Sequence, residues 1–247
     1  MRIRKWYLDL VTDDGTAFIG YSLRVRWAGI KINCAASLIS APDRHPIQKF
    51  VLRTTRRPHL RDGIVSWDCP QLGLQGRWTA RAGPIRRRLH RDEHGCIDWL
   101  CHQPAADCTL VVGERTLRGS GYVEELRLSL APWRLDIDQL TWGRFISRAD
   151  SLVWIQWEGA EPLRLTLRNG RPVDGDLPLV FGDTRTLRAA ELTPVLRRIP
   201  VIGTLVARKF GETFEHKLLS RATLLDKPDQ PGWAIHETVN WPVAHSR

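Results

Sequence analysis

Apolar and polar residues alternate along most of this chain with a period of two, which is typical of β-strands. The first alternating segments cover residues 5–12 and 16–27. Between them lie Asp13, Asp14 and Gly15, an acidic turn that ends in glycine. Such a turn between two alternating segments predicts a β-hairpin. We therefore expect the chain to begin with two paired strands, followed by a third over residues 29–40.

From residue 63 onward, short apolar segments are separated by Gly, Pro or Asp roughly every 8 to 12 residues, as in antiparallel barrels and sandwiches. The same pattern resumes after Pro132, and Asn169-Gly170 is a typical hairpin turn. One segment differs. Thr193 followed by Pro194 resembles a helix start, because Thr is a good N-cap and Pro is favoured in the first turn. The sequence thus predicts β-structure with one short helix near residues 193–209.

The two halves of the chain share short motifs that indicate an internal repeat. Gly119-Ser-Gly-Tyr-Val-Glu124 is echoed by Gly232-Trp-Ala-Ile-His-Glu237, and Trp6-Tyr-Leu-Asp9 by Trp142-Gly-Arg-Phe145. In this register Glu237 corresponds to Glu124, and Trp142 corresponds to Trp6. We predict an all-β protein of two consecutive antiparallel β-barrels, residues 1–130 and 131–247.

Composition limits the location of the protein. The chain has 247 residues, of which 43% are hydrophobic, and no apolar run approaches the roughly 20 residues that cross a bilayer. The first ten residues lack the apolar core of a signal peptide. Five cysteines, an odd number, fit reduced thiols better than a disulfide framework. We therefore expect a cytoplasmic protein.

The net charge of +10 is almost wholly due to arginine, with 31 arginines against six lysines. The basic residues are scattered, with dense runs only at 53–61 and 86–91. Solvated turns and outer barrel faces explain this pattern best, and nucleic acid is not favoured as a partner. A second interpretation is peripheral contact with anionic lipid at the inner membrane surface.

Common catalytic motifs are absent from the sequence: there is no nucleophile elbow, P-loop, dinucleotide fingerprint or HExxH. Cys96 and Cys101, with His94 and His102, lack the CxxC spacing of structural zinc sites. We expect neither a metal nor an organic cofactor.

The candidate site consists of polar residues in otherwise apolar closing strands, where a charged side chain is costly unless it is paired or used. The catalytic candidates are Glu124, Tyr122, Glu237 and His236. The ligand-binding candidates are Trp6, Trp142, Arg144, Trp154, His216 and Trp233. Alternation places Tyr122 and Glu124 on one face of a strand, whereas His236 and Glu237 must point in opposite directions.

Two structural alternatives accompany this interpretation. The tryptophans could fill the barrels rather than line a cavity. Each carboxylate could pair with Arg144 or Arg221. The functional alternative is a protonated carboxylic acid in an apolar pocket, able to protonate an alkene or polarise a carbonyl.

Three motifs carry a resemblance to a known family: Trp6-Tyr-x-Asp9 with Asp13-Asp14-Gly15, Gly119-x-Gly-Tyr-x-Glu124, and Trp142-Gly-Arg-Phe145. In this order they are similar to the lipocalin-like family of carotenoid 1,2-hydratase (hydroxyneurosporene synthase) and AttH proteins, with tocopherol cyclase-type relatives. The resemblance implies two calycin-type barrels that bind hydrophobic terpenoid or polyketide molecules. In the hydratases, water is added across an isoprenoid double bond without an organic cofactor. The family motifs do not by themselves mark any residue as catalytic.

Two functions of different class follow. The first is a cofactor-free hydratase or cyclase for an apolar isoprenoid or carotenoid-like substrate. The second is a non-catalytic lipocalin-like carrier of a hydrophobic small molecule. A proton donor inside the ligand cavity distinguishes the first from the second.

Overall fold

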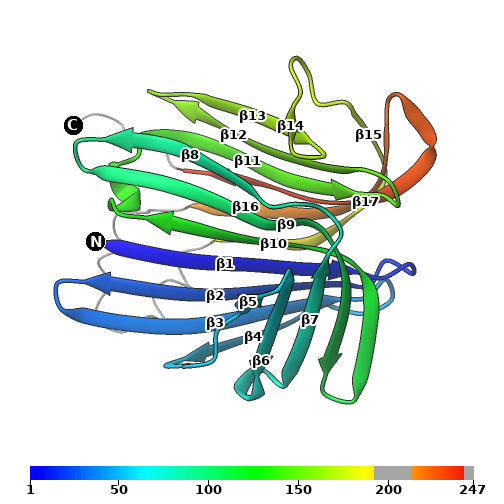
Figure 1. The fold of residues 1–247 in the computed structure, drawn as a ribbon, viewed down its shortest axis with the longest axis horizontal. Helices are drawn as coiled ribbons and strands as arrows, with labels where there is room; N and C mark the ends of the chain where they lie inside the picture. Colours follow the sequence, from blue (N-terminus) through cyan, green and yellow to red (C-terminus); the bar gives the residue numbers. More distant parts are fainter. Residues whose placement is uncertain (192–212, 242–247) are drawn as a thin grey trace. The chain divides into compact units, whose positions relative to one another are not determined.

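The structure, a computed structural model, describes residues 1–191 and 213–241 (Figure 1). The chain divides into two compact units, which we call unit 1 (Met1–Ala131) and unit 2 (Pro132–Arg247). Each unit is described below by itself. The helix predicted near residues 193–209 lies outside the described residues.

Unit 1 contains an antiparallel sheet in the order β4-β3-β2-β1-β10-β9-β7-β6-β5, with β8 also paired to β9 (Figure 1). Its elements are β1 (Arg2–Val11), β2 (Ala17–Trp27), β3 (Ile30–Ser40), β4 (Ile47–Leu52), β5 (His59–Arg61), β6 (Ile64–Cys69), the 3-10 turn η1 (Pro70–Leu72), β7 (Leu74–Ala80), β8 (Ile85–Asp92), β9 (Gly95–Val112) and β10 (Arg115–Leu128). β1 lies between β2 and β10, so the first and last strands of the unit are neighbours.

The predicted N-terminal hairpin is confirmed by β1 and β2. Asp14 accepts hydrogen bonds from the Thr12 hydroxyl and from the Thr16 amide, the latter at 2.9 Å. Gly15 has a φ of 82°, in the region where a side chain is disfavoured. The acidic residue and the glycine therefore each have a separate role in closing the turn.

Tryptophan fills the core of unit 1. Trp67 and Trp78 are fully buried together with Leu8, Leu10 and Phe18. A Cβ at Gly76 would come within 2.3 Å of the Trp78 ring, so only glycine leaves room for it. The Trp78 indole also donates a hydrogen bond to the Asp9 carbonyl at 2.7 Å. At these positions the aromatic residues fill space instead of lining a cavity.

Unit 2 contains a smaller antiparallel sheet in the order β14-β13-β12-β11-β17-β16-β15. Its elements are the 3-10 turn η2 (Pro132–Arg134), β11 (Ile137–Ile146), β12 (Ser151–Gly159), β13 (Leu163–Arg168), β14 (Arg171–Pro172), β15 (Leu179–Glu191), β16 (Phe214–Leu224) and β17 (Lys227–Asn240). Phe145, Leu152 and Trp154 are central to its core. Asn169 and Gly170, with φ of 49° and 79°, form the predicted turn between β13 and β14.

The predicted all-β fold class is confirmed, since nearly all described residues outside turns are in antiparallel strands. The two barrels predicted from the sequence are not found as closed barrels in the described ranges, because the outermost strands of each sheet, β4 and β5 in unit 1 and β14 and β15 in unit 2, do not pair with each other. No helix among the described residues is long and apolar enough to cross a membrane.

The internal repeat is visible in strand order. The sequence β3-β2-β1-β10-β9 of unit 1 has the same connectivity as β13-β12-β11-β17-β16 of unit 2. However, Glu124 lies opposite Tyr7, whereas Glu237 lies opposite Trp142. If the two glutamates correspond, Trp142 therefore matches Tyr7, and the predicted match to Trp6 is wrong by one residue. A shift of one residue moves a side chain to the other face of a sheet.

Candidate functional site

The most distinctive polar group in unit 1 surrounds Glu124 on β10. The carboxylate is 7% exposed, and the Tyr122 ring beside it is fully buried. Glu124 Oε2 accepts a hydrogen bond from the Tyr122 hydroxyl at 2.7 Å and one from the Trp99 indole at 2.5 Å. The predicted shared face of Tyr122 and Glu124 is confirmed. We call Glu124, Tyr122, Trp99 and Cys101 the Glu124 cluster.

The local sequence explains how the cluster forms. Cys101 lies directly opposite Glu124 in the β9–β10 pairing, and Trp99 lies two residues from Cys101 on β9. Residues two apart on a strand point to the same face. The tyrosine, the glutamate, the tryptophan and the cysteine therefore meet on one face of two neighbouring strands.

Burial determines the protonation of the neighbours of Glu124. Burial, followed by the nearby charges of Cys101 and Glu124, raises the pKa of Tyr122 well above its usual value. Burial is also the largest cause that raises the pKa of the Cys101 thiol well above its usual value. Both groups therefore keep their protons at neutral pH. Tyr122 acts as a hydrogen-bond donor to Glu124.

The predicted pairing of Glu124 with an arginine is not found. In residues 1–191 and 213–241, no ion pair involves Glu124. Arg144, which is 1% exposed, donates from Nη1 to the Trp233 carbonyl at 2.7 Å. The Arg221 guanidinium lies over the Trp233 ring, 4.9 Å from its centroid. Glu124 instead receives hydrogen bonds from neutral donors, which gives it a different chemistry from an ion-paired carboxylate.

In unit 2, Glu237 has a cationic partner. The Lys217 ammonium, whose side chain is 1% exposed, forms an ion pair with Glu237 and lies 3.7 Å from Glu215. Arg188 is 3.3 Å from Glu215, which extends the network. Trp142 lies across from Glu237 in the pairing, with the ammonium 6.0 Å from its ring centroid. Glu237 is thus part of a buried ion network.

His236 points away from Glu237, as the strand alternation predicts. Its Nε2 lies 2.9 Å from the Ser220 hydroxyl, and its ring is 4.7 Å from Phe181 and 6.3 Å from Trp154. Burial, followed by the charges of His216 and Lys217, lowers the pKa of His236 to about 4. The imidazole is therefore neutral at neutral pH.

The ten predicted site residues fall into separate groups. Tyr122 and Glu124 meet in unit 1, His236 and Trp154 meet in the unit 2 core, and Glu237 and Trp142 meet on the other face of that sheet. Arg144 contacts Trp233. His216 Nε2 lies 3.4 Å from the Thr186 hydroxyl. Trp6 lies on the core side of β1, opposite Glu125 instead of Glu124.

The sequence interpretation missed Trp99, Cys101 and Lys217 because their contacts depend on strand pairing. It also missed Glu125, which is 1% exposed and binds Arg4 at 2.7 Å and Arg127 at 2.6 Å. Burial alone would raise the pKa of Glu125, but hydrogen bonds from His102 and Arg127 and the charges of Arg4 and Arg127 lower it to about 2. In the sequence, the only sign that Glu125 is buried and ion-paired is that two adjacent carboxylates, Glu124 and Glu125, lie in an otherwise apolar strand.

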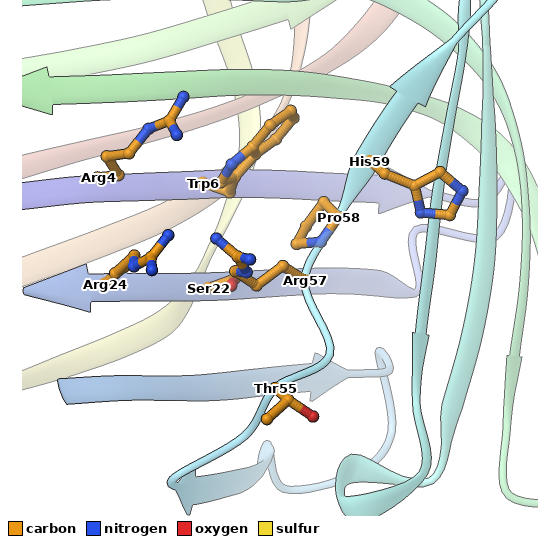
Figure 2. A pocket seen from close by; sticks show the side chains of 8 residues that line it. All are labelled: Arg4, Trp6, Ser22, Arg24, Thr55, Arg57, Pro58 and His59. Atoms are coloured by element: carbon orange, nitrogen blue, oxygen red, sulfur yellow. The ribbon is translucent and has the colours of Figure 1, made fainter. Parts of the chain in front are cut away.

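A cavity of about 340 Å³ opens beside Trp6 in unit 1 (Figure 2). We call it the arginine pocket; its lining residues are Arg4, Trp6, Ser22, Arg24, Thr55, Arg57, Pro58 and His59. It is on the core side of β1, whereas the Glu124 cluster is on the opposite side. Among the described residues, no cluster of His, Cys, Asp and Glu could hold a metal ion.

Comparison with known proteins identifies the fold. No family model matches the chain, and no curated protein matches it. Among solved structures, CghA in complex with Sch210972 has a TM-score of 0.62 at 12% identity, over 99% of this chain and 89% of that one. AttH from Nitrosomonas europaea has a TM-score of 0.57 at 11% identity, over 98% and 93% of the two chains.

Kievitone hydratase from Nectria haematococca gives a TM-score of 0.55 at 9% identity, over 96% of this chain and 88% of that one. At such identities the similarity concerns the fold. It spans both units, in agreement with the resemblance indicated by the three sequence motifs. The chain thus has the lipocalin-like β fold of CghA, AttH and kievitone hydratase.

Proposed function

We propose that this chain is a cofactor-free enzyme of the hydratase or cyclase type that acts on an apolar, isoprenoid-like substrate, with Glu124 as the proton donor. The observation that supports this proposal is the buried Glu124 carboxyl, which is bonded to the neutral donors Tyr122 and Trp99. The shared fold with a kievitone hydratase supports the reaction class by analogy.

The proposed reaction is proton transfer followed by water addition. The Glu124 carboxyl protonates one carbon of an alkene, which leaves a carbocation at the other carbon and a carboxylate on the enzyme. Water then bonds to the carbocation and returns a proton to Glu124, so the net change is addition of water. In a cyclase, an internal double bond replaces water and a carbon-bound proton is returned instead.

The neighbours of Glu124 have defined roles in this scheme. Tyr122 and Trp99 both donate hydrogen bonds to Oε2 of Glu124 and therefore hold the carboxyl group in one orientation. Hydrogen bonds to a carboxylate are stronger than those to its neutral form, so both donors stabilise the product of proton transfer. The ring of Tyr7 lies 6.1 Å from that of Tyr122, and aromatic faces stabilise a nearby cation.

A non-catalytic carrier is the second candidate. The observation that favours it is the location of the arginine pocket, which opens on the side of β1 opposite the Glu124 cluster. A ligand in that pocket would lie away from the proposed acid. In this case the protein would bind a small molecule without changing it.

Labelled water distinguishes the two functions. The full chain is incubated with a set of isoprenoid alkenes in water that contains heavy oxygen, and extracts are analysed by mass spectrometry. A hydratase incorporates the heavy oxygen, whereas a cyclase yields an isomer of unchanged mass with a new retention time. Glu124→Gln keeps the shape but removes the transferable proton, so product formation should fall by roughly 10² to 10⁴.

The control variant is Glu158→Gln, at an exposed position of unit 2. It should not change product formation. Recovery of every alkene unchanged, with bound alkene in the extracted protein, would instead support the carrier. Equal product yield from Glu124→Gln and the unaltered protein would exclude Glu124 as the acid.

A further inference from the structure

We propose that the arginine pocket of unit 1 is a binding site for a small organic anion, such as a carboxylate or phosphate ester carried on a flat apolar group. The charged group would lie among Arg4, Arg24 and Arg57, and the apolar part would contact Trp6. This inference does not depend on the proposed reaction at Glu124.

Strand pairing brings like charges together in this part of the sheet. Arg4 on β1 lies directly opposite Arg24 on β2, and also opposite Arg127 on β10. Two residues along, on the same face of the sheet, Arg2 lies opposite Arg26. Like charges directly opposite each other destabilise a sheet. Such an arrangement is best explained by a ligand that carries the opposite charge.

The carboxylates of the protein neutralise only part of this charge. Glu125 binds Arg4 and Arg127, and Asp98 binds Arg88 at 2.8 Å. In the described part of the chain, neither Arg24 nor Arg57 has an ion-pair partner, and the buried Nε–H of Arg24 donates no hydrogen bond there. Two guanidinium groups are therefore available to an anion.

The charge around Arg24 affects its own ionisation. Partial burial, followed by the charges of Arg26, Arg57 and Arg4, lowers the pKa of Arg24 from its usual value. Arginine remains protonated in proteins because its pKa is so high. The part of the lowering that comes from Arg26, Arg57 and Arg4 reflects a positive potential, which attracts anions.

Trp6 provides the apolar part of the site. Its ring stacks on that of His102, with centroids 4.7 Å apart and an interplanar angle of 14°. His102 in turn lies 3.5 Å from Glu125, so the indole is held by neighbours on the sheet. Figure 2 shows Trp6 among Arg4, Arg24, Arg57 and Pro58. A flat ligand could contact the indole while its charged end reaches the arginines.

The size of the site favours a small molecule. Its volume of about 340 Å³ lies near the lower end of the range of ligand pockets, roughly 300 to 1,000 Å³. A second cavity of about 340 Å³ shares Arg4 and Arg24 and is also lined by Arg2, Arg26 and Arg127. Planar guanidinium groups bind carboxylate and phosphate oxygens in pairs. Arginine is thus suited to this recognition.

Calorimetric titration of the full chain tests the proposal with three probes: naphthyl phosphate, naphthol and inorganic phosphate. We expect naphthyl phosphate to bind at least tenfold more tightly than either of the other two, because only it has both the charge and the flat apolar part. Its affinity should also decrease as salt concentration rises.

Arg24→Gln gives a matched test. It should weaken naphthyl phosphate binding by roughly 10- to 100-fold, the effect of losing a hydrogen bond to a charged group. Its unfolding midpoint should stay the same or rise, because a like-charge contact is removed. Arg86→Gln, at an exposed position on β8, should change neither value.

Three outcomes would overturn the proposal. Equal affinities for naphthol and naphthyl phosphate would show that charge is not recognised. Unchanged binding in Arg24→Gln would place the probe elsewhere. Binding of heparin fragments that tightens steadily with fragment length, without binding of naphthyl phosphate, would indicate a surface for polymers instead of a small-molecule pocket. None of these measurements uses enzymatic turnover.

Discussion

Glu124 and Glu237 occupy similar places in the two units but have different partners. Each lies on the last strand of its unit, opposite an aromatic residue on the first. Glu124 receives hydrogen bonds from Tyr122 and Trp99, whereas Glu237 pairs with the Lys217 ammonium. A carboxylate beside a buried cation is held in its charged form. The comparison places an ionic network in unit 2, and in the proposed function it leaves Glu124 of unit 1 as the proton donor.

Parallel substitution of the two glutamates should produce the largest difference. Glu124→Gln should reduce turnover by roughly 10² to 10⁴ while substrate affinity changes little, since a general acid is lost. Glu237→Gln should leave turnover per folded molecule within a factor of about two and lower stability instead. Steady-state kinetics with an active alkene and chemical unfolding check both. A loss of turnover in Glu237→Gln alone would reverse the assignment.

The next largest effect concerns Lys217. Lys217→Met leaves Glu237 buried without its cation, and removing one member of a buried pair costs about 3 to 5 kcal/mol. Chemical unfolding should show this loss. The double variant Lys217→Met with Glu237→Leu should recover most of it, because an apolar pair can replace a buried ion pair at little cost. If the double variant is as unstable as Lys217→Met, the pairing is not the cause.

The different partners of Glu124 and Glu237 show which parts of the site can be predicted from the local sequence. Alternation alone places Tyr122 with Glu124 and separates His236 from Glu237, because side chains change face at every residue of a strand. The all-β class and the hairpin at Asp14 follow from equally local patterns.

Partners from other strands could not be predicted in this way. Trp99 reaches Glu124 only through the β9–β10 register, which contains an irregularity near Val123, and Lys217 reaches Glu237 through β16 and β17. Aligning the repeat on Trp6 and Trp142 gave the wrong register by one residue. A tryptophan side chain can pack on either face of a sheet. Its recurrence in two strands therefore does not show that the two residues point to corresponding faces.

The pH dependence of the free energy of unfolding should differ between the two units, and this effect is smaller than the previous ones. His236 has a pKa of about 4 in the folded state against an ordinary value of 6.5. Between these values the unfolded chain binds more protons, so stability falls as pH falls from about 6.5 to 4. The loss is at most about 3 kcal/mol. His236→Gln should flatten this part of the profile, measured by urea unfolding at several pH values.

Glu125 of unit 1 is the control for that titration. Its pKa is about 2 when folded against 4.5 ordinarily. Its stabilising contribution is complete above about pH 4.5 and is lost as pH falls toward 2. Glu125→Gln should therefore lower stability by a constant amount above about pH 4.5 and change the slope of the profile only between about pH 4.5 and 2. A change in the slope of the profile above pH 5 would contradict the assignment.

The smallest effect should come from Tyr122→Phe, which removes one of two donors to Glu124 and keeps the ring. The Trp99 hydrogen bond remains, so the carboxyl stays in place but its charged form is less stabilised. Because proton donation leaves a carboxylate behind, turnover should fall by roughly 10- to 100-fold, which corresponds to a hydrogen bond to a charged group. The effect should nearly vanish when Tyr122→Phe is combined with Glu124→Gln, since the carboxylate that the hydroxyl stabilises is no longer formed. Undiminished turnover in Tyr122→Phe would show that the hydroxyl has no part in the reaction, and an equal loss in both backgrounds would mean that it acts on the substrate directly.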